Sequence, residues 1–184
     1  MAVMKTASRG ESGFTLIDLL FTASLICTLC TMALPSLYRA RGAAQSASAV
    51  STLRVVNSAQ ISFAVACGSG FYSPDFQTLG IAPVGAVNAF LPADLATGAS
   101  FLKQGYTFGM TGAALAGAPA TCNGQAPGYS ATGYAVWADP LDPQGNPYFY
   151  GSNADGAIYQ HTATFNGMMP ESGRPSIGTP LKTN

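Results

Sequence analysis

The chain has few charged side chains. Asp, Glu, Lys and Arg make up only 9% of its 184 residues, and eight acidic residues balance eight basic ones. A protein whose main partner is nucleic acid needs a basic surface to neutralise phosphates, and no cluster of basic residues stands in this sequence. A weakly charged surface is instead expected of a subunit that packs against copies of itself.

Residues that carry catalysis are also scarce. The one histidine, His161, falls on a predicted strand, where a lone histidine is usually a surface or core residue. The sequence contains no G-x-S-x-G motif, no H-E-x-x-H motif and no glycine loop of the kind that binds phosphate. No internal repeat is visible either. We therefore do not expect an enzyme.

What the chain does have is a long apolar stretch, residues 14–37, in which Asp18 is the only charged residue. As a helix it would be ~36 Å long, enough to cross a hydrocarbon core of ~30 Å. The polar leader before it, residues 1–13, carries Lys5 and Arg9, and basic residues keep their flank on the cytoplasmic side. A cleaved signal peptide is the alternative, but the stretch exceeds the usual apolar core of about 7–15 residues and lacks a clear A-x-A-like site.

The start of this stretch carries a recognisable motif. Residues 12–20 read S-G-F-T-L-I-D-L-L, which resembles the class III signal of type IV pilins and type II secretion pseudopilins. The resemblance implies that a prepilin peptidase cuts after Gly13, that the new N-terminal residue Phe14 is N-methylated, and that the apolar helix remains on the mature protein. The family's acid is normally glutamate. Asp18 keeps the charge on a side chain one methylene shorter.

Asp18 also needs a physical explanation. A carboxylate at the centre of a membrane-spanning helix costs ~2.5–3.5 kcal/mol even on the insertion scale, so such residues usually have a partner. Cleavage after Gly13 would give Phe14 a cationic α-amine. We expect the amine of one copy to pair with Asp18 of a neighbouring copy, which would also fix the axial register between them. The alternative is that Asp18 lies shallow enough to reach water unaided.

The helix is predicted to continue beyond the apolar stretch. Pro35 removes one backbone hydrogen bond and is expected to kink the helix there, as in type IV pilins, rather than to end it at the membrane edge. Residues 38–67 form the amphipathic half. Its expected buried face contains Val50, Leu53, Asn57, Ile61 and Ala64.

The remainder of the chain predicts a small globular head, residues 68–165. We expect a short helix around residues 76–79 and a three- or four-stranded antiparallel sheet packed on the amphipathic half of the helix. Four runs of aromatic and β-branched residues supply the strands, and residues 153–156 form a hairpin turn. The fold class is therefore α+β and type IV pilin-like. Residues 166–184 are predicted to be a flexible C-terminal tail. The four runs are residues 106–110, 134–138, 148–150 and 157–161.

The four cysteines fall into two pairs. Cys27 and Cys30 lie in the apolar stretch, without the polar surroundings or partner ligands that zinc or redox chemistry needs, and are expected to be small apolar helix residues. Cys67 and Cys122 lie in the part predicted to be outside the cytoplasm. That compartment and the even number of cysteines favour a disulfide between them.

Calcium is the one cofactor that the sequence raises. Asp139, Asp142, Asn153 and Asp155 offer hard oxygen ligands in the region where some pseudopilins bind calcium. The alternative is that they form turns, because no twelve-residue EF-type spacing is present.

Three functions are compatible with this organisation. The first is a pilin assembled into a type IV pilus-like filament for adhesion, motility or uptake. The second is a pseudopilin in a periplasmic piston for type II secretion, and the third is a membrane-anchored binding domain that does not polymerise. The family resemblance implies a homo-oligomer, with prepilin peptidase and an inner-membrane assembly machinery as partners. The precursor would lie in the inner membrane with its head outside the cytoplasm, and the filament would be extracellular or periplasmic.

Overall fold

The computed structural model describes residues 14–181, which fall into two compact units, one ending at Ala40 and the other beginning at Arg41. One helix, α1 (Leu16–Ala66), runs without interruption through both units, so the expected long N-terminal helix is confirmed. The leader with Gly13 and residues 182–184 lie outside the described residues.

The first unit is the apolar half of α1. Every described residue of it, from Phe14 to Ala40, is exposed, and the segment is long and apolar enough to cross a membrane. Pro35 lies inside the helix, so the alternative of a helix stop at this proline is wrong. Hydroxyl groups on this half, such as those of Thr31 and Ser36, donate to the carbonyl three residues earlier, so they satisfy themselves within the helix. The kink at Pro35 remains a prediction.

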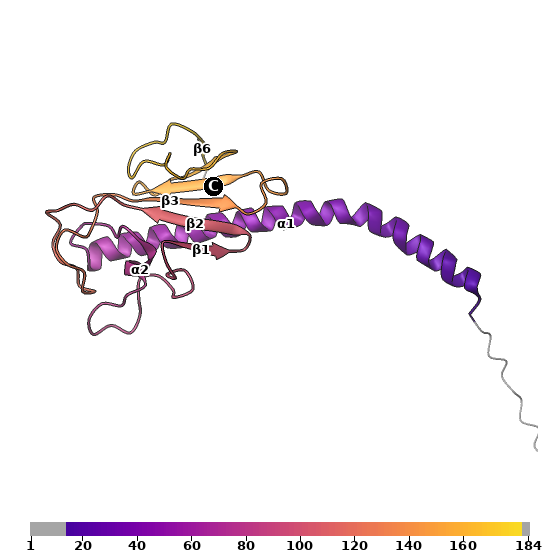
Figure 1. Ribbon diagram of the computed structural model, residues 1–184, viewed down its shortest axis with the longest axis horizontal. Helices are drawn as coiled ribbons and strands as arrows, with labels where there is room; N and C mark the ends of the chain where they lie inside the picture. The colour runs from indigo at the N-terminus through magenta and orange to yellow at the C-terminus, as the bar shows by residue number, and fades with distance from the viewer. Residues whose placement is uncertain (1–13, 182–184) are drawn as a thin grey trace, which may run out of the picture. The chain divides into compact units, whose positions relative to one another are not determined.

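The second unit is built on a six-stranded sheet that is antiparallel throughout, with its strands in sequence order (Figure 1). The α+β class is therefore confirmed, but the expected number of three or four strands is too low. The two additional strands are the outermost ones, β1 and β6. The six strands are β1 (Ser100–Lys103), β2 (Tyr106–Thr111), β3 (Ala135–Pro140), β4 (Phe149–Asn153), β5 (Ile158–His161) and β6 (Thr179–Pro180).

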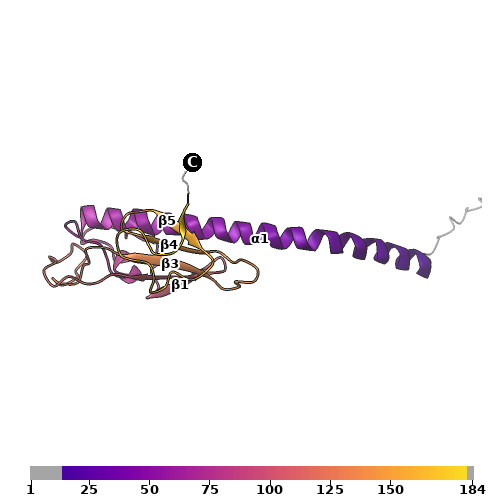
Figure 2. The same cartoon turned by 90° about the horizontal axis from the view of Figure 1, so that it is seen from above.

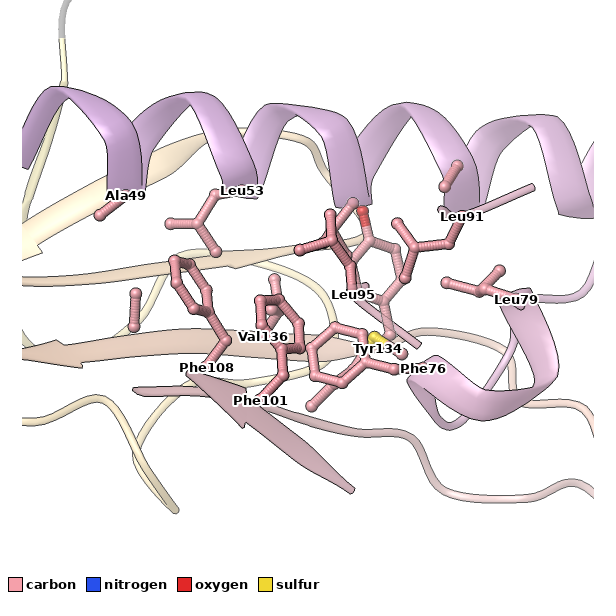
Figure 3. Close-up of a cluster of buried hydrophobic side chains, with 14 of the residues drawn as sticks. Ala49, Leu53, Phe76, Leu79, Leu91, Leu95, Phe101, Phe108, Tyr134 and Val136 are labelled. Atoms are coloured by element: carbon pink, nitrogen blue, oxygen red, sulfur yellow. The ribbon is translucent and has the colours of Figure 1, made fainter. Parts of the chain in front are cut away.

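One face of the sheet packs on the C-terminal half of α1, as Figures 1 and 2 show. Strand residues alternate between the two faces, and those on the inner face meet the helix in one apolar core (Figure 3). Helix α2 (Phe76–Leu79) closes this core at one end. Asp75 is the N-cap of α2, and its side chain accepts a hydrogen bond from the Thr78 N–H. Buried core residues include Leu53, Val56, Phe63, Phe76, Phe108, Tyr134 and Val136.

The buried face of α1 differs in part from the expected one. Leu53, Asn57 and Ala64 are buried as predicted, but Ile61 is 53% exposed. The positions facing the sheet run through Ala49, Leu53, Val56, Gln60 and Phe63. The sequence did not predict this face correctly because Gln60, a buried polar residue, interrupts the apolar pattern.

Buried polar side chains fix the register of α1 on the head. Asn57 accepts a hydrogen bond from the Tyr134 hydroxyl at 3.0 Å and donates to Ser152 Oγ at 2.8 Å. Gln60 donates to the Ser73 carbonyl and accepts from its N–H. Burial raises the pKa of the Tyr134 hydroxyl, which therefore keeps its proton and remains a donor. Because the buried side chains of Asn57 and Gln60 both have partners on the head, the helix cannot slide by one turn without leaving these groups unsatisfied.

The C-terminal segment is not a free tail over residues 166–181. The Phe165 ring covers Gly151 of β4, where a β-carbon would lie only 2.7 Å from it, and Met169 is buried beside it. Strand β6 then pairs with β5, and Asn153 donates to two carbonyls of the segment. The segment therefore covers the part of the outer face over β4 and β5, which its glycine- and proline-rich composition does not predict.

A disulfide joins Cys67 to Cys122, the pair that the sequence predicted. It links the residue after the end of α1 to a loop 55 residues further along the chain. The Cys122 N–H also donates to the Cys67 carbonyl at 3.3 Å, and its own carbonyl accepts from Val84. The bridge therefore holds the helix end and two loops together.

Replacing Cys122 by serine should destabilise the head, because the unfolded chain gains the freedom of a long loop. We expect the free energy of unfolding to fall by ~2–4 kcal/mol, measured by denaturant unfolding under non-reducing conditions. Cys27→Ser with Cys30→Ser is the matched control, since both thiols are free and exposed in the apolar half. An unfolding midpoint for Cys122→Ser equal to that of the control would contradict the prediction.

Candidate functional site

Two of the residues that the sequence singled out for processing and assembly, Phe14 and Asp18, lie at the start of α1, whereas Gly13 lies outside the described residues. Phe14 and Thr15 precede the helix, and Asp18 lies in its first turn. The Thr15 hydroxyl donates to Asp18 Oδ2 at 2.5 Å, and the Thr15 N–H donates to the same oxygen at 3.3 Å. The Asp18 N–H donates in return to Thr15 Oγ1 at 3.3 Å. These reciprocal bonds form a capping box.

Sequence reasoning missed this role of Asp18, although the signal was present. T-L-I-D has the spacing of a hydroxyl residue followed three positions later by an acid, at the start of an apolar run. The negative charge also lies where the helix dipole favours it. Asp18 thus stabilises the start of its own helix. Its second oxygen, Oδ1, accepts no hydrogen bond from any residue between 14 and 181.

The surface that follows this site is apolar around the whole helix. Large side chains from Phe14 to Tyr38 are each at least half exposed, and they are not restricted to one stripe. A helix that is apolar on all sides is one that is covered on all sides, by lipid or by protein. Cys27 and Cys30 belong to this surface as free, exposed thiols.

The four oxygen-bearing candidates for calcium do not converge. Asn153 pairs with Ala135 at the beginning of β3, whereas Asp139 lies near the end of that strand. Asp142 accepts from two N–H groups of its own turn, and Asp155 accepts from Gly173. Within residues 14–181, no group of three or more His, Cys, Asp or Glu side chains could hold a metal ion. The arrangement gives each of these side chains a structural task.

Asp139 stands apart from the other three. It lies on the outer face of β3, where its Oδ2 accepts a hydrogen bond from the Thr164 hydroxyl at 2.7 Å. Its Oδ1 is buried and accepts none from the described part of the chain. Burial raises the pKa of this carboxyl group, and the Thr164 hydrogen bond partly opposes the shift. His161 makes no hydrogen bond with Asp139 among the described residues. Its Nδ1 accepts a hydrogen bond from the Ala163 N–H in a local turn.

Comparison of the chain with protein-family models, with curated proteins and with solved structures gives no match. Any functional assignment therefore rests on the motif around Gly13, on the fold and on the geometry of the first turn of α1.

The raised pKa of Asp139 predicts how its replacement depends on pH. The folded state holds the proton more tightly than the unfolded state, so the contribution of Asp139 is most favourable below its unfolded pKa, near 4, and declines as the pH rises through the folded value. Asp139→Asn cannot ionise. Its melting temperature relative to wild type should therefore be higher at pH 7 than at pH 4.

Asp142→Asn is the matched control for the loss of one negative charge, because the Asp142 side chain is exposed. Asp139→Asn should gain melting temperature relative to wild type between pH 4 and pH 7, and the loss of an exposed charge at Asp142 should not reproduce that gain. If its melting temperature differs from that of wild type by the same amount at both pH values, the burial of Asp139 has no such effect.

Proposed function

We propose that this chain is a structural subunit of a type IV pilus-like filament, processed after Gly13 and assembled through the apolar half of α1. The observation that carries this proposal is that every residue from Phe14 to Ala40 is exposed. From Leu16 onwards these residues belong to the same helix whose C-terminal half packs on a folded head. A membrane anchor alone needs only to be apolar. The motif that precedes the helix, and the acid in its first turn, are what favour assembly.

The exposed apolar half fits a subunit that first lies in the membrane and then in a filament. Before assembly, lipid covers the large side chains. Exposing them to water would cost a free energy of ~25 cal/mol for each Å² of apolar surface. In a filament the same surface is buried against the helices of other copies. Since the side chains are apolar on all sides, one copy can contact several neighbours.

Charge pairing supports the same assembly. Cleavage after Gly13 leaves Phe14 with a cationic α-amine two residues before the start of α1, where its own helix dipole disfavours a positive charge. The Asp18 Oδ2 is engaged in its own capping box, and Oδ1 is the oxygen left for a neighbour's amine. The pair would neutralise two charges that lipid tolerates poorly and would fix the register between copies.

The disulfide supports an exported head. Structural disulfides persist outside the cytoplasm, and this one closes the folded unit rather than the apolar one. The precursor would thus lie in the inner membrane with its head outside the cytoplasm. Prepilin peptidase and the assembly machinery of that membrane would be its partners.

The proposal is tested by shearing cells and analysing the released fibres. We expect the protein in long fibres, with a mass and N-terminal sequence that begin at methylated Phe14. Loss of protein export on deletion of the chain, without long fibres, would instead favour a secretion pseudopilus. A chain that still begins at Met1 and stays monomeric in the membrane would contradict the proposal.

A pair of substitutions separates the two roles of Asp18. Asp18→Asn removes the charge but keeps an oxygen that can accept from the Thr15 N–H, whereas Thr15→Ala removes the hydroxyl bonds and keeps the charge. If charge pairing drives assembly, Asp18→Asn should abolish or strongly reduce fibre yield.

Thr15→Ala should leave assembly largely intact, because an N-cap loss costs only ~1 kcal/mol of helix stability. The readouts are fibre yield after shearing and the membrane level of each processed subunit. Equal fibre yields from Asp18→Asn and wild type would rule out the pairing.

A further inference from the structure

The outer face of the sheet is covered on one side and open on the other. The C-terminal segment covers β4 through Phe165, whose ring lies over Gly151. Beside this cover a groove of about 430 Å³ runs along β2, within the volume range of small-molecule sites. Its lining includes Ser100, Thr107, Gly109, Trp137, Asp139 and Asn166.

Trp137 makes a flat platform at this groove. It lies directly opposite Gly109 in the β2–β3 register. A β-carbon on Gly109 would meet three atoms of the indole at 2.5–2.8 Å, so the face of the ring lies against the strand. Only glycine allows this approach. The opposite face of the indole consequently points away from the sheet, where a flat apolar surface of a ligand can stack on it.

Polar groups surround this platform. Thr107 stands opposite Asp139 in the register, and Ser100 and Asn166 line the same groove. The hydroxyl and amide groups can both donate and accept hydrogen bonds, whereas an ionised carboxylate only accepts. Asp139 Oδ1 is buried without a hydrogen bond from the described residues. None of the described residues that line the groove is basic, which disfavours a phosphate or another anion.

We propose that this groove binds a neutral saccharide, with a sugar ring stacked on Trp137 and a sugar hydroxyl donating to Asp139. Sugar hydroxyls donate and accept, and so match the hydroxyl and amide groups of the lining as well as the carboxylate. Rotation about the soft χ2 torsion of Asp139 would turn Oδ1 towards such a hydroxyl. An ammonium ligand could pair with the carboxylate. It has no hydrogen-bond acceptor, however, for the hydroxyl and amide donors that line the groove. The site belongs to the head and does not depend on filament assembly.

Trp137 is the only tryptophan in the chain, so its fluorescence reports on the groove. The full chain is placed in phosphatidylcholine nanodiscs, which contain no sugar. It is then titrated separately with maltotriose, lactose and triacetylchitotriose, and with tetramethylammonium as the cationic probe. We expect at least one of the three saccharides to change the Trp137 emission saturably, and tetramethylammonium to leave it unchanged.

Two variants test the assignment of the contacts. Asp139→Asn should weaken saccharide binding by roughly tenfold or more, the loss expected when a hydrogen bond to a charged group is replaced by one to a neutral group. Gly109→Ala should also weaken it by displacing the indole. Asp142→Asn, on the exposed turn after β3, should bind as wild type. Circular dichroism and melting temperature establish that each variant is folded.

Three outcomes would overturn the proposal. The first is that none of the three saccharides alters the emission at millimolar concentration. The second is that Asp139→Asn, shown to be folded, binds with the wild-type affinity. The third is that tetramethylammonium binds in preference to the saccharides, which would make the groove a cation site.

Discussion

The structure depends on the need to cover one apolar surface. Residues 14–40, helical from Leu16 onwards, have no buried side chain, and the large apolar residues among them are at least half exposed. The buried positions of α1 begin only at Ala49. Exposed apolar surface is costly in water, so we propose that lipid or other copies of the chain cover it. The properties of the N-terminal half, including the rarity of charge and the self-capped Asp18, follow from that need.

The head meets the opposite requirement, since it must be stable in water with few charged groups. It does so by covering both faces of one sheet. The inner face packs on α1 and is held in register by Asn57 and Gln60, while Phe165 and the C-terminal segment cover part of the outer face. The disulfide between Cys67 and Cys122 closes the end where α1 stops. Each of these devices acts within the head and would operate without assembly.

The sequence predicted the elements whose signal is local. The uninterrupted helix, the four-residue helix at Phe76–Leu79 and strands β2 to β5 each carry their own periodicity or caps. Strands β1 and β6 were missed because they are only four and two residues long, too short to show a periodic pattern, and they are defined by pairing with a neighbour. The cover over β4 was missed for a similar reason. Its only signal in the sequence was Gly151 inside a strand. A glycine there indicates that another group packs closely on the strand backbone, but it does not identify Phe165 as that group.

The candidate site was predicted in part for the same physical reasons. Phe14 and Asp18 lie within five consecutive residues, so a local motif can identify them, and the T-L-I-D spacing also contains the signal of the capping box. The groove beside Trp137 is different, because Gly109, Trp137 and Asn166 come from three separate segments. The antiparallel register places Gly109 opposite Trp137, and the C-terminal segment brings Asn166 to the same groove. Composition also suggested four calcium ligands that the sheet in fact keeps apart, at opposite ends of β3.

Cys27 and Cys30 allow the most direct test of the central claim, that the apolar half of α1 is never open to water in the native protein. They are the free thiols among the described cysteines, since Cys67 and Cys122 are bridged. A membrane-impermeant, water-soluble maleimide should label neither thiol in intact membranes or in sheared material. It should label both after unfolding in denaturant with detergent. Labelling of the native protein as fast as that of the unfolded chain would contradict the claim.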